Sequence, residues 1–171
     1  MKMKHPMLRF LSLFILLLFI QTSVLAQTKL DKTLKKWNTE SVPYIHPENL
    51  TDTASFTLLD TRKKEEYTVS HLKDALWVGD KAFEPSVILE KIPNKERPIV
   101  VYCSIGVRSE DIGEKLLALG YTNVQNLYGG IFQWKNNDRI IYNEKEQPTD
   151  SVHAFSKHWG KLLEKGVKVY E

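Results

Sequence analysis

The feature that most constrains the fold of this sequence is a short apolar run that ends at its single cysteine. Residues 99–102 (IVVY) are apolar and mostly β-branched, which is typical of a strand buried on both faces of a parallel sheet. Residues 103–108 (CSIGVR) interrupt the run, and residues 109–119 then carry apolar side chains near helical spacing before Gly120, a favourable helix stop. A buried strand, a short loop and a helix in this order predict an α/β domain.

Short strands and helices alternate through the rest of this domain. The predicted strands are residues 44–46, 56–60, 75–78, 99–102 and 123–127. The predicted helical segments are residues 62–70 (a helical turn or a surface loop), 84–92, 109–119 and a short helix around Phe132 and Trp134. This alternation favours a three-layer domain in which a mainly parallel sheet of about five strands is flanked by helices.

Two further segments flank the domain, which we place at residues 43–140. Residues 27–42 are predicted to contain a short amphipathic lead-in helix, because Leu30, Leu34 and Trp37 recur at helical spacing. This helix precedes the first predicted strand and is expected to pack at the entrance of the domain.

Residues 141–171 are predicted to form a polar linker followed by a C-terminal amphipathic helix. Residues 143–150 (NEKEQPTD) are polar, and Asp150 suits the N-cap position of a helix over residues 151–165. Apolar side chains recur there at helical spacing before Gly166; they are Val152, Phe155, Trp159, Leu162 and Leu163. We expect this helix to cover an exposed part of the domain, with a surface for a partner protein as the alternative.

The beginning of the sequence, residues 1–26, has the composition of a secretory signal peptide. Lys2, Lys4 and Arg9 precede an apolar run, and small side chains follow it up to Ala26. We expect cleavage after Ala26 and a mature protein that is periplasmic or secreted. The alternative is an uncleaved membrane anchor, although the apolar run is shorter than the about 20 residues that a spanning helix needs.

Charge and cysteine content exclude several classes of protein. Residues 1–26 hold three of the 24 basic residues and none of the 21 acidic ones, so the remainder is balanced at 21 of each. A neutral chain lacks the positive surface of nucleic-acid binders and membrane-surface proteins, so we expect neither partner after signal cleavage. One cysteine excludes an internal disulfide framework and a multi-cysteine zinc site, and we predict no metal.

Cys103 stands where a parallel sheet binds its ligands, beyond the carboxyl end of a strand. The following helix directs its N-terminal N–H groups back at this loop, and such donors stabilise a thiolate over a thiol. Gly106 permits a tight loop, and Arg108 adds a permanent positive charge. We therefore expect a reactive nucleophile; the alternatives are a buried structural thiol for Cys103 and a structural ion pair for Arg108.

Two stretches of the sequence resemble the rhodanese family of single-domain sulfurtransferases. Residues 100–134 resemble the active-site loop, its helix and the next strand with its Gly-Gly-x-x-x-Trp element. Residues 58–78 resemble the element that contains Asp-x-Arg, Glu-Tyr and a Gly-His-Ile-x-Gly-Ala turn. The resemblance covers about residues 43–137 and implies a three-layer, rhodanese-like fold.

The resemblance also implies that Cys103 is the catalytic nucleophile of a thiosulfate sulfurtransferase-like enzyme. Cys103 would take a sulfane sulfur from a small anionic donor such as thiosulfate. Its persulfide would pass the sulfur to cyanide or to a thiol acceptor. A thioredoxin-like reductant is one such thiol acceptor. The loop would bind the substrate, with Arg108 orienting the donor; its residues are Ser104, Ile105, Gly106, Val107 and Arg108. No cofactor is implied.

The departures from the family pattern bear on the substrate. Ser104 stands where thiosulfate-using members often have Arg and mercaptopyruvate-using members often have Gly, so the donor is left open. Four residues separate Cys103 from Arg108, whereas the phosphatases and arsenate reductases of this fold have five. This spacing disfavours the phosphatase or reductase alternative. Ser70, Leu72 and Asp74 depart from the family within a turn, away from the chemistry.

Three more residues at family positions are expected to support the structure rather than to catalyse. Asp60 and Arg62 would fix loops through hydrogen bonds, with Arg62 paired to Glu66, and His71 would be a hydrogen-bonded structural histidine. The remaining alternative for the whole domain is a non-enzymatic rhodanese-like module that binds sulfur or a partner protein.

Overall fold

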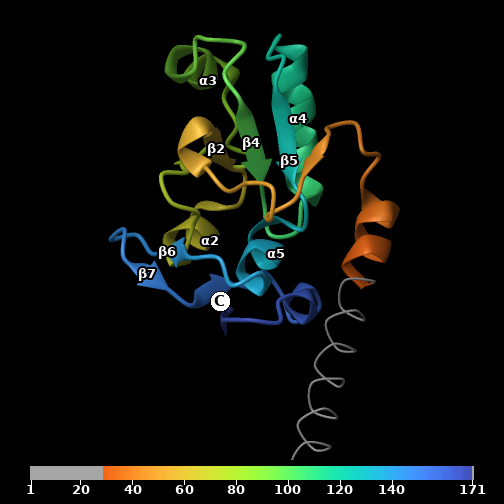
Figure 1. The fold of residues 1–171 in the computed structure, drawn as a ribbon, viewed down its shortest axis with the longest axis vertical. Helices are drawn as coiled ribbons and strands as arrows, with labels where there is room; N and C mark the ends of the chain where they lie inside the picture. Colours follow the sequence, from red (N-terminus) through yellow and green to blue (C-terminus); the bar gives the residue numbers. More distant parts are fainter. Residues whose placement is uncertain (1–28, 171) are drawn as a thin grey trace, which may run out of the picture.

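A five-stranded sheet, in which every pair of neighbouring strands is parallel, forms the centre of the molecule (Figure 1). This computed structural model describes residues 29–170. The strand order is β1-β5-β4-β2-β3. The strands are β1 (Tyr44–Ile45), β2 (Thr57–Asp60), β3 (Leu76–Trp77), β4 (Ile99–Tyr102) and β5 (Val124–Leu127). The predicted α/β fold with a mainly parallel sheet is thereby confirmed.

The central position of β4 follows from its apolar composition. All four of its residues are buried, and the strand pairs with β2 on one side and with β5 on the other. Asp60, the last residue of β2, lies opposite Tyr102, the last residue of β4. The carboxyl ends of these strands therefore meet at one edge of the sheet, and the segment that begins at Cys103 leaves the sheet there.

Helices cover both faces of the sheet. They are the helix at residues 29–37, α2 (Lys64–Val69), α3 (Pro85–Lys91), α4 (Val107–Ala118) and α5 (Gly130–Asn136). Successive strand residues face opposite layers, since Leu58 and Val100 belong to one hydrophobic cluster and Leu59 and Val101 to the other. The cluster around Leu59 packs the sheet against α3 and α4. The predicted lead-in helix is confirmed over residues 29–37.

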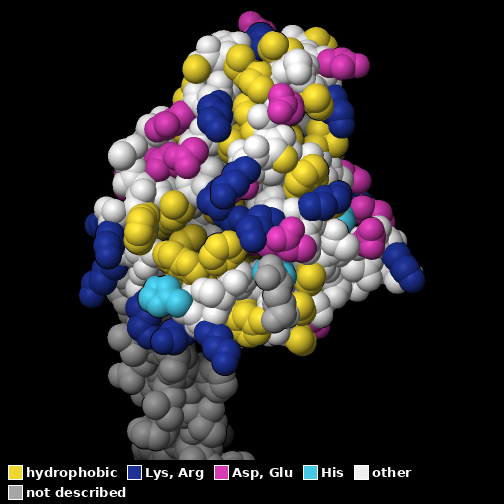
Figure 2. All heavy atoms as spheres, turned by 180° about the vertical axis from the view of Figure 1, so that it is seen from behind, with side chains coloured by type: hydrophobic (Ala, Val, Ile, Leu, Met, Phe, Trp, Pro, Cys, Tyr) yellow, Lys and Arg dark blue, Asp and Glu magenta, His cyan; other side chains and the backbone are white. Residues whose placement is uncertain are grey.

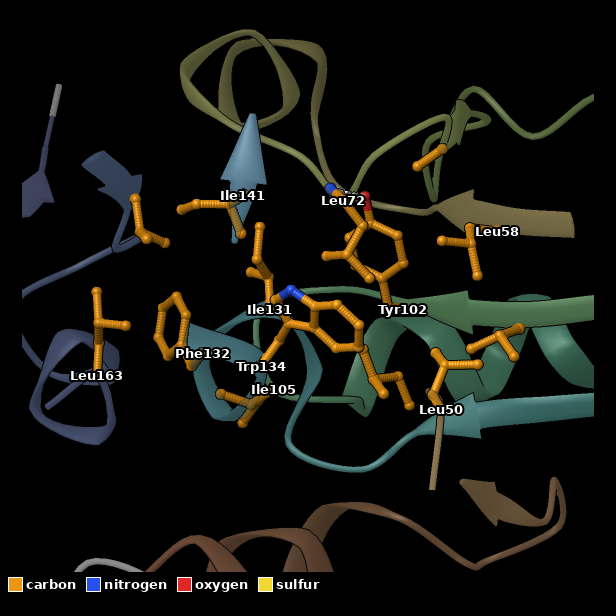
Figure 3. Close-up of a cluster of buried hydrophobic side chains, with 14 of the residues drawn as sticks. Leu50, Leu58, Leu72, Tyr102, Ile105, Ile131, Phe132, Trp134, Ile141 and Leu163 are labelled. Atoms are coloured by element: carbon orange, nitrogen blue, oxygen red, sulfur yellow. Dashed lines mark hydrogen bonds between the residues drawn. The ribbon is translucent and has the colours of Figure 1, made fainter. Parts of the chain in front are cut away.

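Figure 3 shows the other cluster, in which strand, helix and C-terminal side chains meet. Tyr102 of β4 is fully buried there, and its hydroxyl accepts a hydrogen bond from Leu72 N–H at 3.1 Å. Phe132 and Trp134 of α5 lie in the same cluster as Leu163 from the C-terminal segment. The segment after α5 therefore completes the core of the domain instead of lying apart from it.

The expected polar linker is an ordered hairpin. Strands β6 (Ile141–Tyr142) and β7 (Pro148–Thr149) pair antiparallel. The backbone of Tyr142 also exchanges two hydrogen bonds with the backbone of His71, at 2.8 and 2.9 Å. These bonds tie the hairpin to the turn before β3.

The predicted C-terminal amphipathic helix is wrong. Residues 151–165 contain strand β8 (Ser151–His153) and the 3-10 helix η2 (Trp159–Leu162), and β8 pairs in parallel with β9 (Val167–Val169). Three consecutive residues, Val152, His153 and Ala154, are buried, while Phe155 is half exposed, so burial here does not follow the predicted helical spacing. Apolar residues at helical spacing thus meet the core in an extended conformation, and packing overrides the pattern.

Long-range hydrogen bonds explain why this segment is not helical. The Asn136 side chain of α5 donates to Leu162 C=O at 3.0 Å. Its Oδ1 accepts from Glu164 N–H and Lys165 N–H, at 2.7 and 3.2 Å. Backbone groups that a helix would pair internally are bonded to α5 instead, and no local sequence pattern carries that information.

The predicted signal peptide, residues 1–26, lies outside the described residues. Within residues 29–170, no helix has the length and apolar character that a membrane crossing requires. On the face shown in Figure 2, basic and acidic side chains are intermixed.

Candidate active site

Cys103 is the first residue after β4 and lies in a tight loop that leads into α4. It is 1% exposed, and its Sγ accepts a hydrogen bond from Gly106 N–H at 3.1 Å. Gly106 has φ = 106°, a left-handed conformation that glycine adopts without strain. The loop thus turns a backbone donor and the N-terminus of a 12-residue helix toward the sulfur.

The orientation of Gly106 is fixed by two buried amide side chains. Asn38 and Asn126 both donate to the Gly106 carbonyl from Nδ2, at 2.9 and 2.8 Å. Ser109 donates from Oγ to Asn126 Oδ1 at 2.7 Å and holds that amide in place. These bonds fix the peptide plane between Gly106 and Val107, which adjoins the plane that carries the Gly106 N–H.

The N-terminus of α5 is hydrogen-bonded to the backbone of the cysteine loop. Ile131 N–H donates to Cys103 C=O at 3.0 Å, and Phe132 N–H donates to Ser104 C=O at 3.1 Å. Gly130 makes this contact possible, because a Cβ at that position would lie 2.3 Å from Cys103 O. The glycine pair before α5 therefore serves the cysteine loop as well as its own turn.

Arg108 binds a carboxylate of the protein in this structure. Its Nη1 and Nη2 donate to Glu66 Oε2 and Oε1, at 2.7 and 2.9 Å. Nη2 also donates to Ser104 Oγ at 2.9 Å, and that hydroxyl donates to Glu66 Oε1 at 3.0 Å. This is the geometry of the structural ion pair that the sequence left as an alternative for Arg108.

Opposing effects set the ionisation of this pair. Burial raises the pKa of Glu66, but hydrogen bonds and charge from Arg108 outweigh burial, and the pKa lies below its ordinary value. Burial lowers the pKa of Arg108, yet the bonds to Glu66 raise it above the ordinary value. Both groups are therefore charged at neutral pH, and the positive charge at the end of the loop is balanced.

Asp60 and Arg62 form a separate, fully buried pair at the end of β2. Arg62 donates from Nε to Asp60 Oδ1 at 3.0 Å and from Nη2 to Oδ2 at 2.6 Å. Nη2 also donates to Ser70 C=O at 2.6 Å, which ties the turn before β3 to the sheet. The predicted pairing of Arg62 with Glu66 is wrong, because Arg62 binds Asp60 and Glu66 binds Arg108.

His71 lies at the hairpin side of this turn. Its ring stacks on Tyr67, with centroids 4.1 Å apart. Nδ1 lies 3.1 Å from Tyr67 C=O, and Nε2 lies 3.1 Å from Glu146 Oε1. His71 is not one of the described residues that line the pocket above Cys103. The structure thus places His71 between α2 and the hairpin.

A pocket of about 210 Å³ lies directly over the cysteine loop. Cys103, Ser104 and Arg108 are among the residues that line it. Its remaining lining is apolar and consists of Trp37, Ile105, Val107, Phe155 and Trp159. The loop residues named from the sequence are therefore together at one pocket, apart from Gly106, which faces the sulfur through its backbone.

We call Trp37, Phe155 and Trp159 the aromatic collar. Trp37 and Trp159 meet edge to face with ring centroids 6.4 Å apart. Phe155 lies over the Arg108 guanidinium, 5.1 Å from ring centroid to Cζ. The collar joins the helix at residues 29–37 to the C-terminal segment across the mouth of the pocket, and Figure 1 shows both segments beyond the carboxyl end of β4.

Sequence reasoning missed the residues that hold the loop and close the pocket. Glu66 had a usable signal, because it lies three residues after Lys63, the residue that caps the start of α2, where carboxylates are common. Its partner was nevertheless assigned wrongly. Asn38 and Asn126 carry no motif that marks them. The collar residues were assigned to helix packing, and only the three-dimensional path of the C-terminal segment brings them to Cys103.

The described residues contain no group of three or more His, Cys, Asp or Glu side chains placed to hold a metal ion. The chemistry that the arrangement can perform is that of a shielded sulfur nucleophile. The Cys103 sulfur has the Gly106 N–H on one side and a mainly apolar pocket on the other.

Comparison with known families and proteins agrees with this geometry. A model of the Rhodanese-like domain family matches residues 47–137. The chain is similar to the thiosulfate sulfurtransferase GlpE of Coxiella burnetii, at 24% identity over 56% of this chain and 87% of that protein. It is also similar to the adenylyltransferase and sulfurtransferase UBA4 of Candida albicans, at 32% identity over 47% of this chain and 19% of that protein.

Other curated relatives are much longer than the matched region. The tRNA uridine(34) hydroxylase of Photorhabdus laumondii is 32% identical over 52% of this chain, a match that covers 26% of that protein. The chain thus spans between about a fifth and a third of the length of several relatives.

Solved structures show the same fold. A thiosulfate sulfurtransferase from Pseudomonas aeruginosa superposes with a TM-score of 0.55 at 20% identity, over 81% of this chain and 26% of that one. The rhodanese-like domain of Anabaena Alr3790 gives a TM-score of 0.53 at 22% identity, over 59% of this chain and 79% of that one.

Proposed function

Because this chain belongs to the Rhodanese-like domain family, we propose that it is a sulfurtransferase that carries a sulfane sulfur on Cys103. The observation that carries the proposal is the geometry of the loop. Cys103 follows the central strand, and its Sγ accepts the Gly106 N–H at the N-terminus of α4. A thiolate held in this way is the nucleophile that sulfur transfer needs.

The first step loads the cysteine. The thiolate of Cys103 attacks the outer sulfur of a donor such as thiosulfate. The S–S bond of the donor breaks, its electron pair leaves with sulfite, and Cys103 keeps a persulfide with the negative charge on its outer sulfur. The loop N–H groups of residues 104–108 would stabilise this charge.

The second step unloads it. A thiophilic acceptor, either a thiol or cyanide, attacks the outer sulfur of the persulfide. The S–S bond at Cys103 breaks, and its electron pair returns to Sγ. The acceptor leaves as a persulfide or as thiocyanate, and Cys103 is again a thiolate. Two separate transfers through one covalent intermediate predict ping-pong kinetics.

A direct test combines mass spectrometry with an activity assay. After incubation with thiosulfate, we expect the peptide that contains Cys103 to gain one sulfur atom and the protein to form thiocyanate from cyanide. Cys103→Ser loses both. Wild-type protein in denaturant is the matched control, because it keeps the thiol and loses the loop, so we expect a much slower gain of sulfur.

The opposite result also has a clear meaning. If neither thiosulfate, mercaptopyruvate nor an organic persulfide adds sulfur to the folded protein, the enzyme proposal fails. A non-enzymatic rhodanese-like binding module would then be the better reading of the domain.

We also propose that the protein is exported with a cleaved signal peptide. The basic residues, apolar run and small residues of 1–26 support this proposal. N-terminal sequencing of exported protein is expected to begin at Gln27. Retention of residues 1–26 would point to a membrane anchor.

A further inference from the structure

We propose that the acceptor of this sulfur transfer is a small organic thiol with an uncharged aryl or alkyl body, which the aromatic collar binds above Cys103. The proposal rests on the sulfurtransferase function and adds the chemical class of its second substrate. It is carried by the shape, charge and backbone of the pocket formed by the collar and the cysteine loop.

The size of the pocket exceeds what the smallest substrates require. A volume of about 210 Å³ has room for about seven water molecules at about 30 Å³ each. Cyanide or the transferred sulfur atom would fill a small part of it. A body of several carbon atoms, with its sulfur at the Cys103 end, matches the space that the collar encloses.

The charge of the pocket disfavours an acceptor with its own charge. Arg108 is the one charged side chain among the described residues that line it. Glu66 binds that guanidinium through two hydrogen bonds, and the Phe155 ring covers it at 5.1 Å. A carboxylate on the acceptor would therefore find the cation of the pocket lining already paired, while the Lys36 and Lys63 ammonium groups lie against the Trp37 and Phe155 rings at 5.4 and 6.0 Å. An apolar body would replace water against those rings.

The backbone of Phe155 gives an independent indication. Its φ is 62°, a left-handed conformation in which a bulky side chain is strained and glycine is not. Strain of this kind persists where the surrounding structure fixes it, often at ligand sites. Hydrogen bonds hold the turn that imposes this φ, from Phe155 N–H to His153 Nδ1 at 3.2 Å and from Ser156 N–H to Ala154 C=O at 2.6 Å. The turn leaves the Phe155 side chain 44% exposed and in the lining of the pocket.

The collar lies outside the residues that the family model matches. The family match spans residues 47–137, and Trp37, Phe155 and Trp159 lie before and after it. Trp37 is 56% exposed, which leaves a large aromatic surface available to a ligand. The residues that perform sulfur chemistry and the residues that would select the acceptor are thus separate along the sequence.

The transfer step balances without a further reactant. The acceptor R–SH attacks the outer sulfur of the Cys103 persulfide anion. The new S–S bond forms on R, the bond to Cys103 breaks, and the products are R–S–SH and the Cys103 thiolate. Sulfur moves as a neutral atom, and the proton stays with the released persulfide.

The test measures kcat/KM for a series of acceptors with thiosulfate as the donor. We expect the value to rise roughly threefold for each methylene from ethanethiol to pentanethiol. We expect 3-mercaptopropionate to be at least about tenfold poorer than propanethiol, which has a similar length and no charge. Cyanide, which has no apolar body, supplies the reference acceptor.

Two variants assign the dependence to the collar. Trp37→Ala is expected to flatten the increase with chain length, and Trp159→Leu provides a second variant with a bulky apolar side chain retained. Ile140→Ala is the matched control, because Ile140 is 57% exposed, like Trp37, and lies outside the pocket. Its dependence on chain length should equal that of the wild type.

The outcomes separate this proposal from the proposed function. A wild-type protein that gains sulfur on Cys103 but shows no dependence on chain length would overturn the collar proposal and leave the sulfurtransferase in place. The collar proposal also fails if Trp37→Ala and Trp159→Leu both keep the full dependence. Absence of added sulfur on Cys103 with any donor would instead overturn the function on which both rest.

Discussion

The cysteine loop and the aromatic collar meet at one pocket but are built on opposite principles. The loop is fixed by polar contacts: Gly106 is held by two amide side chains, and Arg108 by Glu66. The collar consists of three large apolar side chains, of which Trp37 and Phe155 are substantially exposed. The comparison teaches that polar contacts, made mainly within the family-matched region, position the reactive group, while its surroundings come from segments on either side of that region.

Among the substitutions near the cysteine loop, we expect the largest loss of stability at Gly130. An alanine there would have φ near 54° and a Cβ 2.3 Å from Cys103 O, so the loop and α5 would have to separate. We expect Gly130→Ala to lower the free energy of unfolding by at least about 3 kcal/mol, as measured by urea unfolding. Sulfur transfer should fall with it, because Cys103 would lose its position.

Gly120→Ala is the matched control for this substitution. Gly120 also has a positive φ, 89°, but a Cβ there would meet nothing within 4 Å. We expect it to cost about 1 kcal/mol through backbone strain alone. Equal losses for the two variants would contradict the importance of the close approach at Gly130.

A smaller effect is expected at Glu66, which balances Arg108. Glu66→Gln leaves a largely buried guanidinium without its carboxylate, and we expect the free energy of unfolding to fall by about 2–3 kcal/mol. Glu65→Gln, on the same helix and half exposed, should change stability little. If both variants match the wild type, the ion pair does not hold the loop.

The same pair predicts how stability depends on pH. The pKa of Glu66 in the folded protein lies below its ordinary value of 4.5, so the pair contributes fully above that value. Its contribution is lost as the pH falls through the lowered folded pKa. We therefore expect the free energy of unfolding to decrease below about pH 4.5, and to decrease less steeply in Glu66→Gln. Parallel pH profiles would show that other carboxylates cause the decrease.

We expect the smallest loss of stability from substitutions in the aromatic collar. Trp37 is 56% exposed, and we expect Trp37→Ala to lower the free energy of unfolding by about 1 kcal/mol or less. Trp134→Ala, at a residue that is 5% exposed, should cost about 3–5 kcal/mol. A large loss of stability at Trp37 would mean that the collar is part of the core, and the contrast between the two regions would then weaken.

The sequence predicts the sheet well because local pattern and long-range packing agree there. The run at residues 99–102 is apolar enough to predict a central strand of a parallel sheet. Cys103 is the next residue in the sequence, so its place at the carboxyl end of that strand is predicted with it. The positions of Gly106 and Arg108 in the loop can also be identified from their spacing after Cys103. These features need no knowledge of distant residues.

The sequence fails where a residue's partner is far along the chain. Val152 and Leu162 fit a helical pattern, but Val152 pairs within strand β8 and is buried in the core, and Leu162 C=O is bonded to Asn136. Arg62 has two carboxylates within reach along the sequence, and the strand end determines that Asp60 is the one it binds. Such choices depend on tertiary geometry, which periodicity does not encode.

The edge-to-face contact of Trp37 with Trp159 has a consequence for the order of events during synthesis. The sheet and the cysteine loop are made before Phe155 and Trp159, so a growing chain can complete its nucleophile before the roof over it exists. In that interval the sulfur would be open to any electrophile nearby.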